Sequence, residues 1–474
     1  MSDARYAESA APFHPGAPDP QSPKPWLISP RWIAPVEPAQ TVLSEHTVVI
    51  RGECVESILP TAEARRSHPE AEEVRLEHHL LTPGLINTHT HAAMALLRGS
   101  ADGLPLERWL AERIGPLEAA LVSEEFVFDG TVMACAEMLL GGTTTFNDMY
   151  FFPDAAARAA QVMGMRAVIG LIVIDFPTAW ASSIDAYFDQ GLALRDAWRN
   201  ESQVGFALAP HAPYTVSDGP LQRVARLSAE LQLPVHIHVH ETAREVADHQ
   251  SRYGLRPLAR LNQLGLVTPE LMAVHAVHLD ENDRALLARQ GASMVHCPNS
   301  NLKLGSGIAP VAELLRQGVN VALGTDGSAS NNRLDMVLET RMASLLASGR
   351  SGDPRVMDAH RALEAATLGG ARALGQESRI GSIRPGKRAD LAAFDLHEEF
   401  GAPINDPVSH LIYAGGREQV SHVWIEGEPV VVMRQIMGPA AREALAGVRG
   451  RRRVWHNRAG QVVPERSSSG IFRF

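Results

Sequence analysis

The hydrophobic and polar positions of the 474-residue chain form three stretches with different periods. From about Trp26 to Leu80, and again after about Gly375, short apolar runs alternate with polar and turn-forming residues and predict β-strands. Between these stretches, apolar strand-like runs alternate with amphipathic helical segments, which is typical of βα units around a parallel sheet. The pattern therefore predicts an α/β centre flanked by two β-rich pieces.

The central stretch holds eight candidate strands, separated by helical patterns such as "PLQRVARLSAELQ" and "PVAELLRQG". The strands are "LLTPGLINTHTH", "GTTTFNDM", "RAVIGLIVI", "VGFALAPHAPY", "LPVHIHVHE", "LMAVHAVHL", "ASMVHCPNS" and "VNVALGTDG". Eight such units predict an α/β fold, a (β/α)8 TIM barrel over 81–375, in which catalytic groups lie at the C-terminal ends of the strands. Residues 26–80 and 376–435 then form one small composite β-sandwich domain from the two ends of the chain.

The two termini are expected to lie outside these domains. Residues 1–25 are rich in Ala and Pro and have no apolar core of a signal peptide, so they are expected to form a disordered extension. Residues 436–474 are expected to be a C-terminal tail, with the basic run "RGRRRVW" in solvent.

Composition narrows the class of protein. The net charge of −10 and the pI near 6.1 argue against nucleic acid or an anionic membrane as the main partner, because either would require a basic surface. No apolar run of about 20 residues predicts a membrane span. Cys54, Cys135 and Cys297 are too few and too scattered for a disulfide framework, which favours a reducing, cytoplasmic location.

Metal-binding residue types recur at the ends of five predicted strands. His89 and His91 are one residue apart, so a strand would point both to one face, about 7 Å apart along the backbone. An isolated pair of this kind is more often structural. The barrel, however, brings this pair to the same mouth as the other strand-end residues, His211, His238 with Glu241, His275 and Asp326.

Three imidazoles and one carboxylate form a suitable ligand set for a first-row divalent metal, and we assign His89, His91, His238 and Asp326 to it. His238 is chosen in "HIHVHE" because it leaves Glu241 just past the strand end, where it can move a proton between an activated water and a substrate ring nitrogen. His236 is then expected one layer deeper, as a hydrogen-bonded core residue, and the role of His240 stays open.

Five long segments resemble the amidohydrolase superfamily: "PGLINTHTH", "APHAPYTVS", "HIHVHETAREV", "AVHAVHLDENDRALLARQGASMVHCPNSNLKLGSG" and "VALGTDGSASNN". Within it, the sequence is most similar to the 5′-methylthioadenosine/S-adenosylhomocysteine deaminases, from about Trp26 to Val432. The resemblance implies that His275 orients or polarises the reacting water, that Glu241 shuttles the proton and that His211 contacts the substrate. Asp326 is expected to accept a proton as well as bind metal, and His278 is expected to be structural.

A missing residue type bears on the metal count. Binuclear members of the superfamily commonly use a carbamylated lysine on the fourth strand, yet no lysine lies between Lys24 and Lys303. A mononuclear site is therefore expected, with one divalent metal per chain and Zn²⁺ as the first choice. Fe²⁺ or Ni²⁺ would suit the same ligands.

The expected reaction is hydrolytic deamination of an adenine nucleoside, and the oligomeric state is left open, with a homo-oligomer as one option. Trp109 and Glu118 are candidate substrate-binding residues; the resemblance implies that Glu118 accepts hydrogen bonds from the ribose 2′- and 3′-hydroxyls, whereas periodicity alone equally allows an ordinary amphipathic helix. Family members that accept S-adenosylhomocysteine place arginines after the third strand. Residues 167–194 contain none and offer Phe176, Trp180 and Tyr187, so 5′-methylthioadenosine is expected to be preferred, with adenosine also accepted.

Three alternatives remain at this point. A guanine deaminase would keep the site and change the ring, and an s-triazine chlorohydrolase would change the leaving group. A metal-free scaffold protein would be expected to have lost a ligand, and all four are present.

Overall fold

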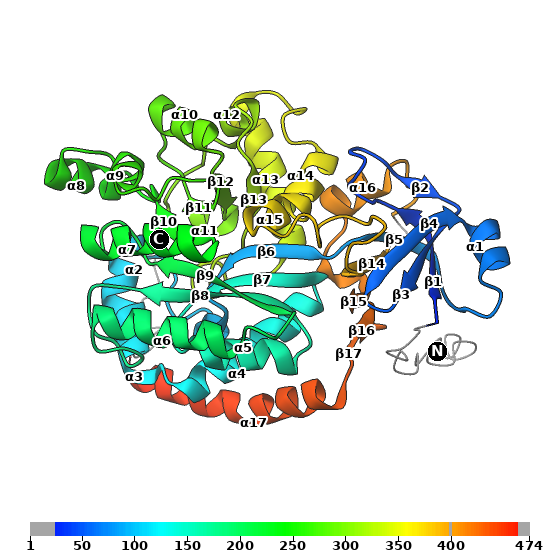
Figure 1. The fold of residues 1–474 in the computed structure, drawn as a ribbon, viewed down its shortest axis with the longest axis horizontal. Coiled ribbons are helices and arrows are strands. Elements are labelled where there is room, and N and C mark those ends of the chain that lie inside the picture. Colours follow the sequence, from blue (N-terminus) through cyan, green and yellow to red (C-terminus); the bar gives the residue numbers. More distant parts are fainter. Residues whose placement is uncertain (1–23, 398–400, 463–474) are drawn as a thin grey trace, which may run out of the picture.

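The computed structural model describes residues 24–397 and 401–462. The predicted N-terminal extension, except for its last two residues, lies outside the described residues. The chain forms a barrel with a β-domain beside it (Figure 1). Within the described ranges, no helix has both the length and the apolar character needed to cross a membrane.

The barrel consists of eight parallel strands hydrogen-bonded in chain order from β6 to β13. These strands are β6 (Leu85–Thr90), β7 (Thr143–Met149), β8 (Arg166–Val173), β9 (Val204–Pro210), β10 (Val235–Val239), β11 (Leu271–His275), β12 (Ser293–His296) and β13 (Val321–Leu323). The end of the ladder returns to its start, where the amide of Asp326 donates to the carbonyl of His89 (3.0 Å). The predicted barrel and its eight strands are confirmed.

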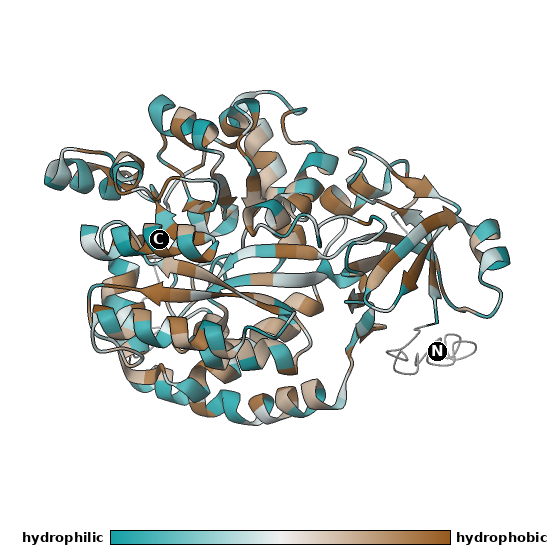
Figure 2. Ribbon diagram, in the orientation of Figure 1, coloured by the Kyte–Doolittle hydropathy of each residue, from teal (hydrophilic) through white to brown (hydrophobic). Residues whose placement is uncertain are grey.

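Close approach of the last strand to the first depends on a glycine. Gly324 directly follows β13, and a Cβ at this position would lie 2.8 Å from the backbone nitrogen of His89. The strands themselves are almost entirely buried. In Figure 2, β8 is largely brown, as a continuous apolar run predicts, whereas β7, with its three threonines, is paler. The barrel interior is therefore a packed core with polar groups concentrated at the strand ends.

Helices with mixed polar and apolar faces surround the barrel (Figure 2). Their limits follow local signals: the Thr242 side chain accepts a hydrogen bond from the Glu245 amide at the start of α8, and Gly254 ends that helix in the left-handed region (φ 70°). The helices are α4 (Glu124–Leu139), α5 (Pro153–Val162), α6 (Ile184–Ala197), α7 (Asp218–Leu231), α8 (Ala243–Tyr253), α9 (Pro257–Gln263), α10 (Glu281–Gln290), α11 (Pro298–Lys303), α12 (Val311–Arg316), α13 (Met336–Ser351), α14 (Ala359–Ala365) and α15 (Leu368–Ala373).

The segment between β6 and α4 contributes to the mouth of the barrel. It contains four short helical pieces: η1 (Ala92–Leu97), α2 (Leu106–Trp109), η2 (Leu110–Ile114) and α3 (Gly115–Leu121). The η2 piece is a π-helical turn, a feature often found at functional sites.

The β-domain is one nine-stranded mixed sheet that combines both ends of the chain. Its strands are β1 (Trp26–Ile33), β2 (Leu43–Ser44), β3 (His46–Arg51), β4 (Cys54–Pro60), β5 (Glu72–Pro83), β14 (Leu391–Asp395), β15 (Val420–Ile425), β16 (Glu428–Val432) and β17 (Gln435–Ile436). The remaining pieces beside it are α1 (Thr61–Ser67), α16 (Pro407–Ser409), η3 (His410–Ala414) and η4 (Arg417–Gln419).

This sheet folds over along β5. Trp26 of β1 pairs with Glu72, the first residue of β5. Trp424 of β15 pairs with Leu391 of β14, which pairs in turn with Pro83, the last residue of β5. The two tryptophans are thus connected to opposite ends of β5, yet their indole rings are only 6.1 Å apart. The two halves of the sheet thus enclose one apolar core. The composite domain from both chain ends is confirmed, and its sandwich is a single folded sheet.

The C-terminal segment is more ordered than a solvated tail. Helix α17 (Pro439–Val462) lies along α3 and α4 on the outside of the barrel (Figure 1). Within the basic run, Arg451 pairs with the buried carboxylate of Asp129, and the indole of Trp455 donates to the same carboxylate (3.0 Å). Phe126 packs edge-on against Trp455. Arg449, Arg452 and Arg453 are exposed, as expected for this run, whereas Arg451 and Trp455 face the barrel, so the prediction of a solvated run is wrong for these two residues. Residues 463–474 of the predicted tail lie outside the described residues.

Candidate active site

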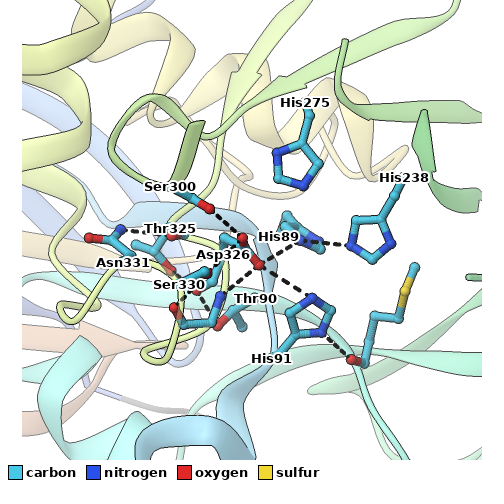
Figure 3. Close-up of polar contacts among 12 residues, drawn as sticks. His89, Thr90, His91, His238, His275, Ser300, Thr325, Asp326, Ser330 and Asn331 are labelled. Carbon is cyan, nitrogen blue, oxygen red and sulfur yellow. Dashed lines mark hydrogen bonds and ion pairs between the residues drawn. The ribbon is translucent and has the colours of Figure 1, made fainter. Parts of the chain in front are cut away.

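The strand-end residues predicted from sequence lie together at the C-terminal mouth of the barrel (Figure 3). Two overlapping groups have potential ligand atoms within 4.8 Å of one another: His89 with His238 and His275, and His89 with His91 and Asp326. His89 is common to both groups. The five side chains come from four strand ends that are up to 237 residues apart in sequence and form one cluster.

The distances within the cluster define its centre. Nε2 of His89 lies 3.2 Å and Nε2 of His91 lies 3.3 Å from Oδ1 of Asp326. Nε2 of His238 is 3.3 Å from Nε2 of His89. Three imidazole nitrogens and a carboxylate oxygen therefore face one small volume, and this donor set fits a first-row divalent ion.

Burial controls the charge of these groups. It lowers the pKa of His89 to about 3 and the pKa of His238 well below the usual range, so both rings are neutral and able to bind metal. Burial alone would lower the pKa of His91, but its contact with Asp326 raises it to about 9. Because a ligand must be deprotonated, protons and metal compete at His91.

Asp326 is held rigidly. Burial alone would raise its pKa, but the contacts with His89 and His91 hold the pKa well below its usual range. Its Oδ2 accepts hydrogen bonds from the hydroxyls of Ser300 (2.6 Å) and Ser330 (2.7 Å), which leaves Oδ1 facing the histidines. Asp326 also has a left-handed backbone (φ 60°), a strained conformation that tends to occur at functional sites.

The other histidines of the two histidine-rich strands have separate roles. His236 is fully buried below the cluster, with Nε2 2.8 Å from Nδ1 of His89, in the deeper layer predicted for it. His240 accepts from the Leu258 amide through Nε2 (3.1 Å) and packs away from the centre. His278 donates from Nε2 to the Ser306 carbonyl (2.7 Å), which agrees with its predicted structural role.

Glu241 lies beside the cluster, just beyond β10. Its Oε2 is 3.8 Å from Nε2 of His275, and burial raises its pKa. The backbone amide of Glu241 donates to the Glu245 carboxylate (2.7 Å), which fixes the turn that carries the side chain. A carboxyl group with a raised pKa holds a proton more readily than an ordinary glutamate, which suits a group that takes up and passes on a proton.

A cavity of about 760 Å³ opens over the cluster. His211, Trp109 and Glu118 all line it, as the sequence predicted for the substrate site. Burial lowers the pKa of His211 to about 4, so this ring is neutral. Trp109 is 4% exposed, and its indole N–H is buried without a hydrogen-bond partner, so this residue contributes apolar ring surface to the cavity wall.

Tyr150 is a polar residue of the cavity lining that the sequence analysis missed. Tyr150 directly follows β7, is 4% exposed, and donates its hydroxyl to Oε1 of Glu118 (2.8 Å). Its position at a strand end was the available signal, because the same rule identified the histidines. Asn301, whose Oδ1 lies 2.8 Å from Nδ1 of His275, follows β12 and was missed as well.

The aromatic wall predicted after the third strand is wrong in part. Phe176 lines the cavity, but Trp180 and Tyr187 do not; they pack against each other with ring centres 5.5 Å apart. The Tyr187 hydroxyl donates to Thr178 (2.8 Å), which lines the cavity, so Tyr187 lies behind the wall and supports it. Among the described residues, no arginine or lysine lines the cavity, as the sequence of this segment indicated.

The comparisons with known proteins agree with this geometry. The amidohydrolase family model matches residues 80–430. The 5-methylthioadenosine/S-adenosylhomocysteine deaminase of Teredinibacter turnerae is 48% identical over 415 residues, covering 88% of this chain and 94% of that protein. The protein of the same name from Saccharophagus degradans is 46% identical over 416 residues, covering 88% and 93%.

Among solved structures, an adenosine deaminase from Xanthomonas campestris with bound zinc is 48% identical and covers 92% of this chain and 98% of its own, with a TM-score of 0.87. Atrazine chlorohydrolase from Arthrobacter aurescens (TM-score 0.81, 22% identity, 90% and 99% covered) and guanine deaminase from E. coli (TM-score 0.77, 24% identity, 86% and 100% covered) share the fold alone. The chain belongs to the amidohydrolase family.

Proposed function

We propose that this chain is a metal-dependent hydrolytic deaminase of adenine nucleosides, with 5′-methylthioadenosine as the preferred substrate. Adenosine is also a substrate, and S-adenosylhomocysteine a poorer one. The observation that carries the proposal is the cluster of inward-facing imidazoles, with Glu241 beside it, at the base of a largely apolar cavity. The relatives named as deaminases of these nucleosides support it.

The proposed cofactor is one Zn²⁺ ion per chain, held by His89, His91, His238 and Asp326. A bound zinc ion supplies a Lewis acid that lowers the pKa of water to near neutrality. The inward Nε2 atoms and Oδ1 of Asp326 suit this ion, and the related zinc-containing structure supports the choice.

The chain's own groups move the protons. Asp326 and Glu241 are the proposed acceptors of the protons of the attacking water, and Glu241 passes one to the ring nitrogen next to the amine-bearing carbon. His275 presents Nε2 toward Glu241 at 3.8 Å and orients the water between them. Addition of the water oxygen, protonation of the amine and its departure release ammonia and leave the inosine analogue.

The cavity wall suits a purine nucleoside. His211 presents a neutral imidazole, which can form a hydrogen bond with the substrate, and Trp109 offers apolar ring surface for a planar base. Glu118, with one oxygen held by Tyr150, offers the other to the ribose 2′- and 3′-hydroxyls.

The preference for the methylthio substituent rests on charge. The described cavity lining contains no arginine or lysine to pair with the carboxylate of S-adenosylhomocysteine, and it includes Met94, Met149 and Phe176, which suit a thioether. Leaving a carboxylate without a partner costs on the order of 1–3 kcal/mol, so kcat/KM should favour 5′-methylthioadenosine by about ten- to a hundredfold.

The location and partners follow from the same features. The three cysteines are free, which supports a reducing compartment, and we place the reaction in the cytoplasm. A small nucleoside is the partner that the cavity suits.

A panel of substrates tests the proposal directly. The zinc-loaded protein is assayed for ammonia release from 5′-methylthioadenosine, adenosine, S-adenosylhomocysteine, guanine and cytosine, and for chloride release from a chlorotriazine. The proposal predicts that 5′-methylthioadenosine is the best substrate. Guanine or the triazine as the best substrate would contradict it, and equal kcat/KM for the two thioethers would refute the preference alone.

A further inference from the structure

The imidazoles of His89, His91, His238 and His275 are each oriented by a contact of Nδ1, the ring nitrogen that faces away from the centre of the cluster. His91 and His238 donate from Nδ1 to the backbone carbonyls of Met149 (2.6 Å) and His211 (2.8 Å). His89 instead directs Nδ1 at a side chain, Nε2 of His236, at 2.8 Å. Among the three histidines proposed as ligands, His89 alone is thus oriented by a side chain, and a substitution can remove that partner.

His236 is built into the barrel for this contact. It is fully buried on β10, two residues before His238 and on the same face of the strand, so it lies one layer below the cluster. The rings of His89 and His236 meet edge-on, with an interplanar angle of 77°. The remaining nitrogen of His236, Nδ1, is buried and has no hydrogen-bond partner.

The direction of this hydrogen bond follows from the chemistry of imidazole. A neutral ring carries its proton on one nitrogen, and His89 must keep the lone pair of Nε2 for the metal. Its Nδ1 therefore carries the proton and donates, and Nε2 of His236 must accept. This leaves the proton of His236 on Nδ1, the atom without a partner.

We infer that His236 is a positioning residue that holds His89 in the tautomer and orientation required for metal binding. The inference rests on the metal site of the proposed function, and it adds a residue that neither contacts the metal nor lines the cavity. Outer partners of this kind typically change metal affinity by about 10- to 100-fold when they are removed. The partner is usually a carboxylate or a carbonyl, and here it is a second imidazole.

Zinc affinity, measured by competition with a chromogenic chelator, tests the inference without any substrate. His236→Leu removes the acceptor and should weaken zinc binding about 10- to 100-fold. His236→Gln places an amide oxygen near the position of Nε2 and should restore binding to within a few-fold of the wild type. His296→Leu, which removes another fully buried imidazole on β12, two strands from β10 in the sheet, is the matched control and should leave zinc affinity unchanged.

Wild-type affinity in His236→Leu, or equal weakening in His236→Leu and His296→Leu, would overturn the inference. A second measurement needs no variant: in the zinc-loaded wild type labelled with ¹⁵N-histidine, a proton on Nδ1 of His89 should show scalar coupling across the hydrogen bond to Nε2 of His236. A proton on Nε2 of His236 instead would refute it. Both readouts are independent of the substrate, so they stand even if the panel shows another reaction.

Discussion

The contact between Tyr150 and Glu118 makes the proposed ribose site testable. Glu118 is half-buried at the cavity wall, and one of its carboxylate oxygens accepts a hydrogen bond of 2.8 Å from the hydroxyl of Tyr150, which is nearly fully buried. Replacement by alanine would also leave that hydroxyl without a partner, at a cost of about 1–3 kcal/mol for every substrate. Glu118→Gln is the sharper change, because its amide oxygen can still accept from Tyr150.

The magnitude follows from the loss of charge. Hydrogen bonds to a charged group contribute about 1.5–3 kcal/mol, against about 0.5–1.5 kcal/mol for neutral pairs. In Glu118→Gln the ribose hydroxyls would bond to a neutral amide instead of a charged carboxylate. The binding free energy should then weaken by about 1–2 kcal/mol, which lowers kcat/KM roughly 5- to 30-fold. The loss should appear mainly in KM, because the ribose does not change charge during deamination.

The assay compares adenosine with 2′,3′-dideoxyadenosine in steady-state deamination. The dideoxy substrate lacks the hydroxyls, so Glu118→Gln should leave its kcat/KM nearly unchanged. Glu112→Gln is the control, since this exposed carboxylate lies on the same segment, outside the cavity lining, and pairs with Arg108. An equal loss for both substrates in Glu118→Gln would show that Glu118 has a structural role and refute the reasoning.

Four further outcomes are expected. Glu241→Gln should lower kcat by at least roughly 10²-fold while zinc content is retained, and near-normal turnover would remove Glu241 from proton transfer. Elemental analysis of fully active protein should give about one zinc per chain, and a value near two would contradict the mononuclear site. Asp129→Ala should lower the free energy of unfolding in urea by about 1–3 kcal/mol, because it leaves the Trp455 N–H without an acceptor; an unchanged value would argue against α17 docking. Burial raises the pKa of Glu339 to about 8, above its value in the unfolded chain. The protonated side chain therefore stabilises the folded state fully below about pH 4.5, and this stabilisation is lost as the pH rises through 8. The free energy of unfolding should fall more steeply from about pH 5 to 8 in the wild type than in Glu339→Gln, and parallel curves would refute this.

The sequence alone was sufficient for the barrel and for the identity of the central cluster. Strand periodicity is local: alternate residues share a face, so His89 and His91 had to point the same way, and parallel strands had to bring their ends together. The same reasoning placed His236 below His238. These features depend on neighbouring residues along one strand, and a sequence records that information directly.

Tertiary structure alone decided the contacts between distant segments. The bond from His89 to His236 joins residues 147 positions apart, and that from Tyr150 to Glu118 joins residues 32 apart. Trp180 and Tyr187 occupy a segment with suitable composition but pack outside the cavity. The period of a strand or helix fixes which face a residue occupies. How deep that face lies, and which side chain meets it there, depends on packing between elements that no local pattern encodes.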